Sequence, residues 1–310
     1  MKMKKFHTFL LLAAVAVSQL SAQVTVSWGS IDKRYPVEVK AEIKPIKSPS
    51  LTAWKGERVN MQLVVTNTAE EQEIAFAFGD LTDKKGNKIS AEYIKGGIVE
   101  PVIADSFSGC SNHAVDAHGN FPTADRITMT SPVKIGKNAM RGLWMTVEVP
   151  RDIAAGTYSG KVTVTAGEKS SVREYKVKVL ESVLPEPKDW KFHLDLWQNP
   201  YAIARVHNVE PWSPEHFEVL RPYMEKLASA GQKAITATLI NKPWNGQTED
   251  PFGSMVTWIK RADGSWLYDF TIFDRWVEFM MECGIDKEIT CFSMIPWKLS
   301  FRYYDQATHS

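Results

Sequence analysis

The feature that most constrains the fold is the change of pattern at Leu184-Pro185-Glu186-Pro187. Two prolines so close together forbid a helix and give a stiff, extended connection. Short alternating runs precede this connection, and strand-like runs that alternate with helix-like runs follow it. A chain of 310 residues has room for about two domains, each with a core of its own. We therefore predict one domain over residues 23–183, a linker over 184–190 and a second domain over 191–310.

Residues 1–22 predict a cleaved secretory signal peptide. They combine a basic start, an apolar run from Phe9 to Val17, and the small residues Ser21 and Ala22 before Gln23. The apolar run is too short to span a bilayer, so we expect no transmembrane segment. The expected location is periplasmic or extracellular.

Composition excludes several classes of protein. The chain is 44% hydrophobic and 24% charged, as expected of an ordinary folded protein, and its net charge of +1 favours no nucleic-acid partner. Cys110, Cys283 and Cys291 are odd in number and far apart, so they predict neither a disulfide framework nor a zinc site. We expect all three to be buried thiols, and we expect no cofactor.

The first domain reads as an all-β sandwich. Turn signals at residues 85–87 and 166–168 separate short runs that have no helical period, which is typical of antiparallel sandwiches. The predicted strands are Val37–Ile43, Val59–Val65, Ile74–Phe78, Leu143–Val149, Gly160–Thr165 and Arg173–Val179.

A long loop is expected from Ala104 to Ile127, and it is rich in metal-ligating residue types. These are Cys110, His113, Asp116, His118 and Asp125. They could bind a metal, or they could be polar residues of a loop packed across a domain interface. Because no helix or tight spacing brings them together, we predict no metal site.

The second domain alternates strands and helices, which predicts a parallel α/β sheet. Ser213 and Pro214 predict a helix start and Gly231 its end, with Pro222 kinking the helix between them. The other predicted elements are strands at Lys191–Trp197, Ala234–Ile240 and Glu288–Ile295 and a helix at Ile272–Cys283.

A barrel is favoured over an open nucleotide-binding sheet. No glycine-rich phosphate loop follows the first strand, and the long insertion Asn241–Phe270, with a hairpin near Asp263-Gly264, is typical of barrel enzymes. A complete barrel needs about 250 residues. We therefore expect residues 191–310 to form the first three β/α units of a TIM-type barrel.

Aromatic and polar residues gather where the predicted strands end. The candidates for substrate binding are Asp195, Trp197, Asn241, Trp244 and Trp297. Indole faces beside carboxylate and amide groups suit a sugar, which offers C–H groups to the ring and hydroxyls to the polar atoms. Alternatively, the tryptophans pack loops or plug the barrel mouth, and loop amides hold Asp195.

The catalytic residues are not assigned. Conventional glycosidases need two carboxyl groups flanking the bond. Asp195, Asp250 and Asp269 are available, but none stands at a strand end with a second acid beside it.

Four phrases resemble the secreted glycoside hydrolase family 123 type. They are DLWQNP at Asp195–Pro200, KPWNGQTEDPFGSMVTWIK at Lys242–Lys260, FDRWVEFM at Phe273–Met280 and SMIPW at Ser293–Trp297, and the GTYSG turn at Gly156–Gly160 accompanies them. The resemblance implies a β-sandwich followed by a catalytic (β/α)8 barrel.

The activity that the resemblance implies is that of an exo-acting β-N-acetylgalactosaminidase, with substrate-assisted retention. The acetamido oxygen of the substrate attacks the anomeric carbon, an Asp orients the amide, and the neighbouring Glu protonates the leaving oxygen. This Asp-Glu pair is expected beyond Ser310, so residues 1–310 alone are expected to be inactive. The alternative is a non-catalytic carbohydrate-binding or cell-surface protein.

Overall fold

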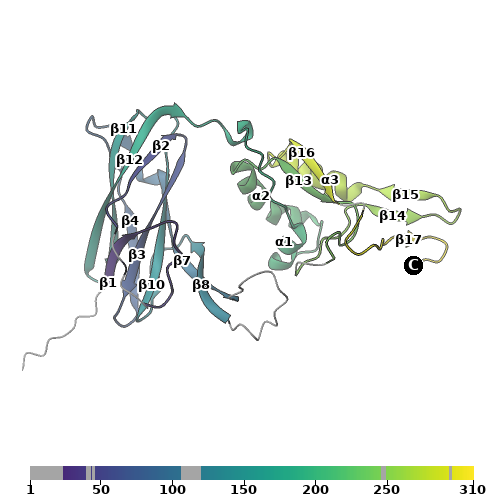
Figure 1. Ribbon diagram of the computed structural model, residues 1–310, viewed down its shortest axis with the longest axis horizontal. Helices are drawn as coiled ribbons and strands as arrows, with labels where there is room; N and C mark the ends of the chain where they lie inside the picture. The colour runs from purple at the N-terminus through teal and green to yellow at the C-terminus, as the bar shows by residue number, and fades with distance from the viewer. Residues whose placement is uncertain (1–23, 40–42, 44–45, 106–119, 246–248, 293–294) are drawn as a thin grey trace, which may run out of the picture. The chain divides into compact units, whose positions relative to one another are not determined.

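The computed structural model describes residues 24–39, 43, 46–105, 120–245, 249–292 and 295–310 (Figure 1). The chain divides into two compact units, one ending at Leu184 and the other running from Pro185 to Ser310. Within the described residues, no helix has both the length and the hydropathy of a membrane span.

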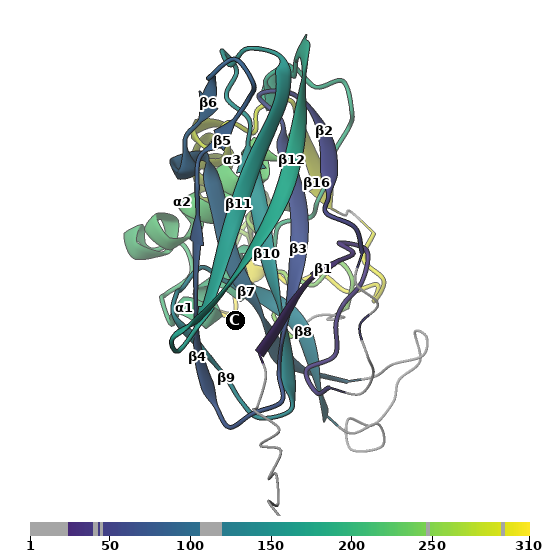
Figure 2. The ribbon, with the colours of Figure 1, turned by 90° about the vertical axis from the view of Figure 1, so that its left-hand side faces the viewer.

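The first unit contains two β-sheets (Figure 2). One is antiparallel, with the order β1 (Val24–Gly29), β3 (Arg58–Asn67), β10 (Ala139–Glu148), β7 (Ile94–Asp105) and β8 (Asn120–Thr128). The other has the order β2 (Ser50–Lys55), β12 (Lys169–Val183), β11 (Gly156–Ala166), β4 (Gln72–Phe78) and β9 (Val133–Ile135), with β5 (Leu81–Thr82) pairing with β11 and β6 (Lys88–Ile89) pairing with β5. The pair β2 and β12 is parallel, and a 3-10 turn at Ala91–Tyr93 precedes β7.

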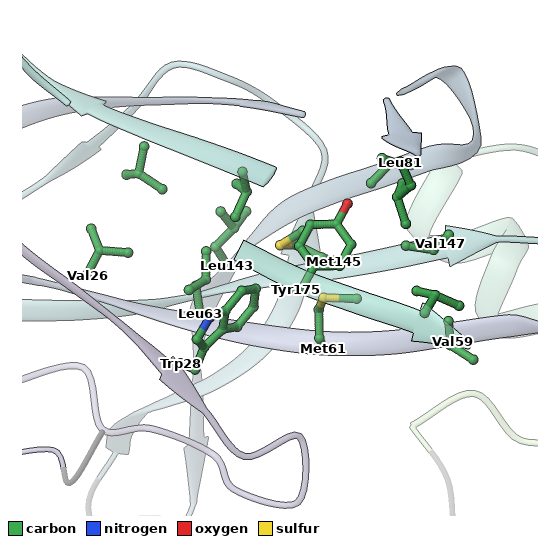
Figure 3. Close-up of a cluster of buried hydrophobic side chains, with 14 of the residues drawn as sticks. Val26, Trp28, Val59, Met61, Leu63, Leu81, Leu143, Met145, Val147 and Tyr175 are labelled. Carbon is green, nitrogen blue, oxygen red and sulfur yellow. The ribbon is translucent and has the colours of Figure 1, made fainter. Parts of the chain in front are cut away.

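Alternation along the strands builds the core between these sheets. On β10, Leu143, Met145 and Val147 are fully buried, whereas Trp144 and Thr146 between them are half-buried on the opposite face. Figure 3 shows the inward side chains of both sheets meeting in one cluster. Each such aliphatic side chain contributes about 2 kcal/mol through burial. This period of two residues is why the predicted strands from Val59 onward are confirmed.

Two buried tyrosines of this core make a matched pair for mutation. The hydroxyl of Tyr158 donates to the carbonyl oxygen of Ala154 at 2.7 Å, whereas the buried hydroxyl of Tyr175 finds no partner in the described part of the chain. Burial accordingly raises the pKa of Tyr175. We expect Tyr175→Phe to raise the free energy of unfolding, and Tyr158→Phe to lower it, by about 1 kcal/mol each. Urea denaturation checks this, and a loss of stability in both variants would contradict it.

The second unit contains three α-helices and two small sheets among its described residues. Its parallel sheet pairs β13 (Ala234–Thr238) with β16 (Glu288–Phe292), and its other sheet has the order β15 (Trp266–Asp269), β14 (Thr257–Lys260) and β17 (Tyr304–Asp305). The helices are α1 (Pro200–His207), α2 (Pro214–Ser229) and α3 (Thr271–Glu282), and a 3-10 turn occupies Pro187–Asp189.

The ends of the helices follow the sequence signals. Ser213 is the N-cap of α2, and its hydroxyl accepts from the backbone N–H of His216 at 3.2 Å. Pro222 lies inside this helix, and Gly231, with φ of 88°, follows its end. The predicted boundaries of α2 and α3 and the hairpin β14–β15 are thus confirmed.

The predicted fold class, an all-β sandwich followed by an incomplete TIM-type β/α barrel, is wrong. The described chain is mostly β-strand with α1, α2 and α3, and the structure shows no TIM barrel in the residues that it describes. The expected first strand, Lys191–Trp197, makes a single bridge between Leu194 and Gln232. Within the described residues, β13 and β16 form a two-stranded parallel sheet.

Two local expectations also need correction, and a third is described only in part. Of the predicted strand Val37–Ile43, residues 40–42 lie outside the described residues, and Glu38 makes an isolated bridge to Ala139. The expected loop Ala104–Ile127 is shorter, because β7 extends to Asp105 and β8 begins at Asn120. Cys283 is buried as predicted, but Cys291 is exposed.

The candidate metal ligands Cys110, His113, Asp116 and His118 lie outside the described residues. Asp125 lies on β8, with its carboxylate 3.6 Å from the guanidinium of Arg34. In the described ranges, no three His, Cys, Asp or Glu side chains are grouped as a metal site.

Candidate functional site

Four aromatic rings meet in the second unit, and we call Trp197, Trp244, Phe252 and Phe292 the aromatic cluster. The rings of Trp197 and Trp244 stack, with centroids 4.7 Å apart and planes at 24°. Phe292 lies 4.7 Å from Trp197 and 4.8 Å from Trp244, and Phe252 lies 4.9 Å from Trp244. Trp197 is nevertheless 54% exposed. The cluster thus fixes an indole whose surface still faces solvent.

The cluster forms at the carboxyl ends of the two parallel strands. Phe292 is the last residue of β16, opposite Thr238 at the end of β13. Trp244 follows in a turn where Lys242 and Asn245 have φ of 52° and 60°. The N–H of Lys242 donates to the carbonyl of Phe252 at 2.8 Å, which closes this turn. Ligands of parallel sheets bind at this end of the strands.

Two buried glutamines hold the Trp197 segment against β13. The side-chain oxygen of Gln198 accepts from the N–H of Thr236 at 2.7 Å, and the N–H of Gln198 donates to the hydroxyl of Thr236 at 3.1 Å. The side-chain oxygen of Gln232 accepts from the N–H of Leu196 at 2.9 Å. These amide groups satisfy backbone groups that a strand ladder would otherwise satisfy.

Asp195 and Asn199 carry the unsatisfied acceptors of this site. In the described structure, Oδ1 of each side chain is buried and has no hydrogen-bond partner. The amide nitrogen of Asn199 is used, since it donates to the carbonyl of Asp250 at 2.8 Å. A buried acceptor without a donor costs about 1–3 kcal/mol. Both oxygens are therefore suited to a hydroxyl or amide donor from a ligand or water.

The other two candidate carboxylates have structural roles. Asp250 accepts a bifurcated hydrogen bond from Nε of Arg205, at 2.7 Å to Oδ1 and 2.9 Å to Oδ2. Asp269 accepts from the N–H of Thr271 at 2.9 Å and from its hydroxyl, which fixes the start of α3. The side-chain hydrogen bond from Thr271 lowers the pKa of Asp269.

The remaining predicted residues lie in the same turns. Asn241 is half-buried and begins the turn that carries Trp244. Trp297 is 67% exposed, and its backbone N–H donates to the carbonyl of Pro243 at 3.0 Å. The structure thus brings Trp197 and Trp244 into direct contact and places Asp195, Asn241 and Trp297 in adjoining segments. Their role in substrate binding stays a prediction.

Phe252, Phe292 and Gln232 were not predicted as site residues. Phe292 stands in the run EITCFSMI, which is typical of a core strand, whereas Phe252 stands in a polar loop between Pro251 and Gly253. Gln232 follows Gly231 at the end of α2, where an exposed polar residue is the usual expectation. The signal that could have found it is a second glutamine, Gln198, directly after the predicted first strand.

His216 ties α2 to the start of α1 and makes the stability of this unit depend on pH. Its Nδ1 accepts from the N–H of Trp212 at 2.9 Å, and its Nε2 donates to the carbonyl of Pro200 at 2.9 Å. Burial lowers the pKa of His216 below its ordinary 6.5, and the hydrogen bond to Pro200 only partly opposes this. The neutral imidazole, which has one accepting and one donating nitrogen, is therefore the form that makes both hydrogen bonds.

Below pH 6.5 the unfolded state binds the His216 proton more readily than the folded state does. We expect the free energy of unfolding to fall as pH drops from 6.5 through the lower folded pKa, and to be fully present above 6.5. Denaturation curves of His216→Gln should lose this part of the pH dependence. His193→Gln is the matched control because His193 is exposed; an unchanged slope in His216→Gln would rule the idea out.

Two family models match the chain. Residues 28–166 match the model described as glycoside hydrolase 123 N-terminal domain, and residues 197–310 match the glycoside hydrolase 123 catalytic domain. The chain is therefore a glycoside hydrolase family 123-like protein, as the sequence phrases predicted.

A solved structure agrees with this family. A family 123 glycoside hydrolase from Clostridium perfringens, whose structure addresses glycolipid glycan hydrolysis, is 27% identical, with a TM-score of 0.85 over 93% of this chain. The match covers 51% of that protein, so the chain spans about half its length.

Other matches are weaker. The CooA pilin subunit of enterotoxigenic Escherichia coli matches 52% of this chain and 99% of its own length, at 12% identity and a TM-score of 0.25, which informs neither fold nor function. A search of curated proteins found no match.

Proposed function

We propose that this chain is the N-terminal portion of a secreted glycoside hydrolase that acts on N-acetylhexosamine-containing glycans. The finer proposal is a β-N-acetylgalactosaminidase-like activity with a substrate-assisted, retaining mechanism. In this proposal the signal peptide is cleaved and the protein acts in the periplasm or outside the cell. Membership of the family 123-like proteins supports the hydrolase class.

The observation that carries the proposal is the stacked pair Trp197 and Trp244 beside Asp195. A sugar places its C–H face on an exposed indole and directs its hydroxyls to fixed polar atoms. Trp197 is 54% exposed although the cluster fixes its orientation, and Oδ1 of Asp195 is a buried acceptor without a donor in the described structure. A sugar hydroxyl on this indole would supply the missing hydrogen bond.

In this proposal the described residues bind and orient the sugar. Trp197 and Trp244 set the plane of the ring, and Asp195 selects a hydroxyl or N–H group at one edge. The acetamido oxygen of the substrate acts as the nucleophile, so no enzyme carboxylate needs to attack the anomeric carbon. Restricting rotation of the bound sugar lowers the barrier for this intramolecular attack.

The test uses the full-length protein and an aryl β-N-acetylgalactosaminide. We expect Trp197→Ala to lower kcat/KM by about 30-fold, which corresponds to about 2 kcal/mol of lost binding to the transition state. Trp266→Ala, which removes an exposed indole of β15, is the matched control and should leave kcat/KM unchanged.

The alternative, a non-catalytic carbohydrate-binding or cell-surface protein, predicts another result. The wild-type protein would bind the glycan without turnover, and Trp197→Ala would abolish that binding. If the Trp197→Ala variant hydrolysed the substrate at the normal rate, the aromatic cluster would have no role in substrate binding.

A further inference from the structure

We propose that the first unit carries a separate binding pocket for a single neutral sugar, which we call the Trp144 pocket. It is a hollow of about 310 Å³ between β8, the outer face of β10 and the segment 31–34. This volume lies at the small end of ligand pockets, which suits one sugar ring. All the residues that line it belong to the first unit, so the proposal is independent of the aromatic cluster and of the proposed hydrolase activity.

The indole of Trp144 forms the floor of the pocket. Trp144 points away from the core, because Leu143 and Met145 on either side of it are fully buried. Its neighbours across the sheet are Gln62 on β3 and Gly97 on β7. The ring is half-buried. An indole offers both an apolar face and an N–H donor.

The absence of a side chain at Gly97 shapes one wall. A Cβ atom there would lie 2.8 Å from both Cγ2 of Ile127 and Sδ of Met129. Glycine therefore lets the β8 side fold closely over the sheet beside Trp144. Ile127 itself lines the hollow.

Gln62 fixes the opposite wall. Its side chain is 4% exposed, and its amide nitrogen donates to the carbonyls of Ser30 at 2.8 Å and Lys33 at 3.3 Å. The N–H of Ser30 donates to the hydroxyl of Tyr35 at 2.8 Å, which closes the segment on itself. The wall is thus organised before a ligand arrives, which lowers the entropic cost of binding.

The charges at the rim balance. Asp32 and Asp125 oppose Lys33 and Arg34 among the lining residues. The pair Arg34 and Asp125 is loose, at 3.6 Å with side chains 73% and 55% exposed, so these groups can turn toward a ligand. A balanced rim gives no net attraction for an anion, whereas its carboxylates and cations accept from and donate to hydroxyl groups. These features together select a neutral polyhydroxylated ring.

A second sugar site would change how the protein behaves on a glycan surface. Two weak sites in one chain raise retention through effective concentration wherever both can engage. The Trp144 pocket would then hold the protein on its glycan without taking part in chemistry.

The test measures sugar binding by saturation-transfer NMR and calorimetry on the intact protein carrying Trp197→Ala, which silences the other indole site. The probes are D-galactose, N-acetyl-D-galactosamine, D-glucose and the anionic D-glucuronate. We expect at least one neutral sugar to bind with a Kd of about 1–10 mM, and Trp144→Ala to weaken it at least about tenfold. Trp144→Phe, which keeps a ring but loses the N–H, should show an intermediate loss and guards against misfolding of the alanine variant.

Trp54→Ala is the matched control, because Trp54 is an exposed tryptophan on β2 of the same unit and does not line the pocket. Its affinity should equal that of the parent. Three results would each overturn the proposal: no neutral sugar binds up to about 100 mM, binding survives in both Trp144 variants, or glucuronate binds more tightly than every neutral sugar.

Discussion

Replacing Trp276 with alanine is expected to lower the free energy of unfolding of the second unit by about 4 kcal/mol. Trp276 lies on α3, is 0% exposed, and its indole N–H donates to the carbonyl of Thr236 at 3.0 Å. Its ring also contacts Phe279 and Trp212, with centroids 6.0 and 5.9 Å away. The substitution therefore opens a cavity between α3 and β13 and leaves a buried carbonyl without its donor.

Guanidinium denaturation followed by circular dichroism measures this loss. The two units have separate hydrophobic cores, so we expect the Trp276 variant to shift the transition of the second unit and leave that of the first in place. Trp266→Ala is the control, because Trp266 is 43% exposed, and it should change stability by less than about 0.5 kcal/mol. A loss below about 1 kcal/mol for Trp276→Ala would show that the core closes around the missing ring.

Elements whose signals are local could be predicted from the sequence. The strands of the first unit are short and alternate, as on β10, where Leu143, Met145 and Val147 are fully buried. Helix α2 begins and ends where Ser213 and Gly231 predict, because capping depends on residues within one turn. Such features need no knowledge of distant neighbours.

The prediction for Lys191–Trp197 was wrong for a physical reason. Alternation indicates which side of an extended segment is apolar, but it does not indicate whether a neighbouring strand offers its backbone groups. Here only Leu194 bridges to Gln232. The predicted barrel depended on this segment as its first strand, and the structure shows no barrel in the residues that it describes.

Of the candidate site, only the polar residues and the tryptophans could be named from the sequence. Trp197 and Trp244 were predicted as site residues because indole faces beside amide and carboxylate groups suit a sugar, and their role stays a prediction. Phe292 was missed because phenylalanine in an apolar run reads as core, and its contact with Trp197 joins residues far apart in the sequence. Phe252 was missed because it stands in a polar loop between Pro251 and Gly253, where no strand is expected. The unsatisfied oxygen of Asp195 is a property of the folded surroundings and leaves no trace in the sequence.

Gln198→Leu is expected to lower the free energy of unfolding by about 3 kcal/mol and to weaken sugar binding at the aromatic cluster. Gln198 is 3% exposed, and its amide nitrogen donates to the carbonyls of Leu196 and Ala234 while its oxygen accepts from the N–H of Thr236. Leucine has a similar size but satisfies none of these groups. Gln306→Leu, at an exposed glutamine of the same unit, should cost less than about 0.5 kcal/mol.

The double variant Gln198→Leu with Gln232→Leu tests whether the two glutamines stabilise the same backbone groups or act independently. Both glutamines bond to the carbonyls of Leu196 and Ala234, so their effects should couple by about 1 kcal/mol or more instead of adding. In the proposed function Gln198 acts on the sugar through the position of Trp197, so its loss should raise the Kd for the glycan more than Gln306→Leu does, even at temperatures where both variants are folded. If Gln198→Leu lost stability but kept its affinity, the stack of Trp197 on Trp244 would be sufficient to orient the indole, and the glutamines would hold only the backbone.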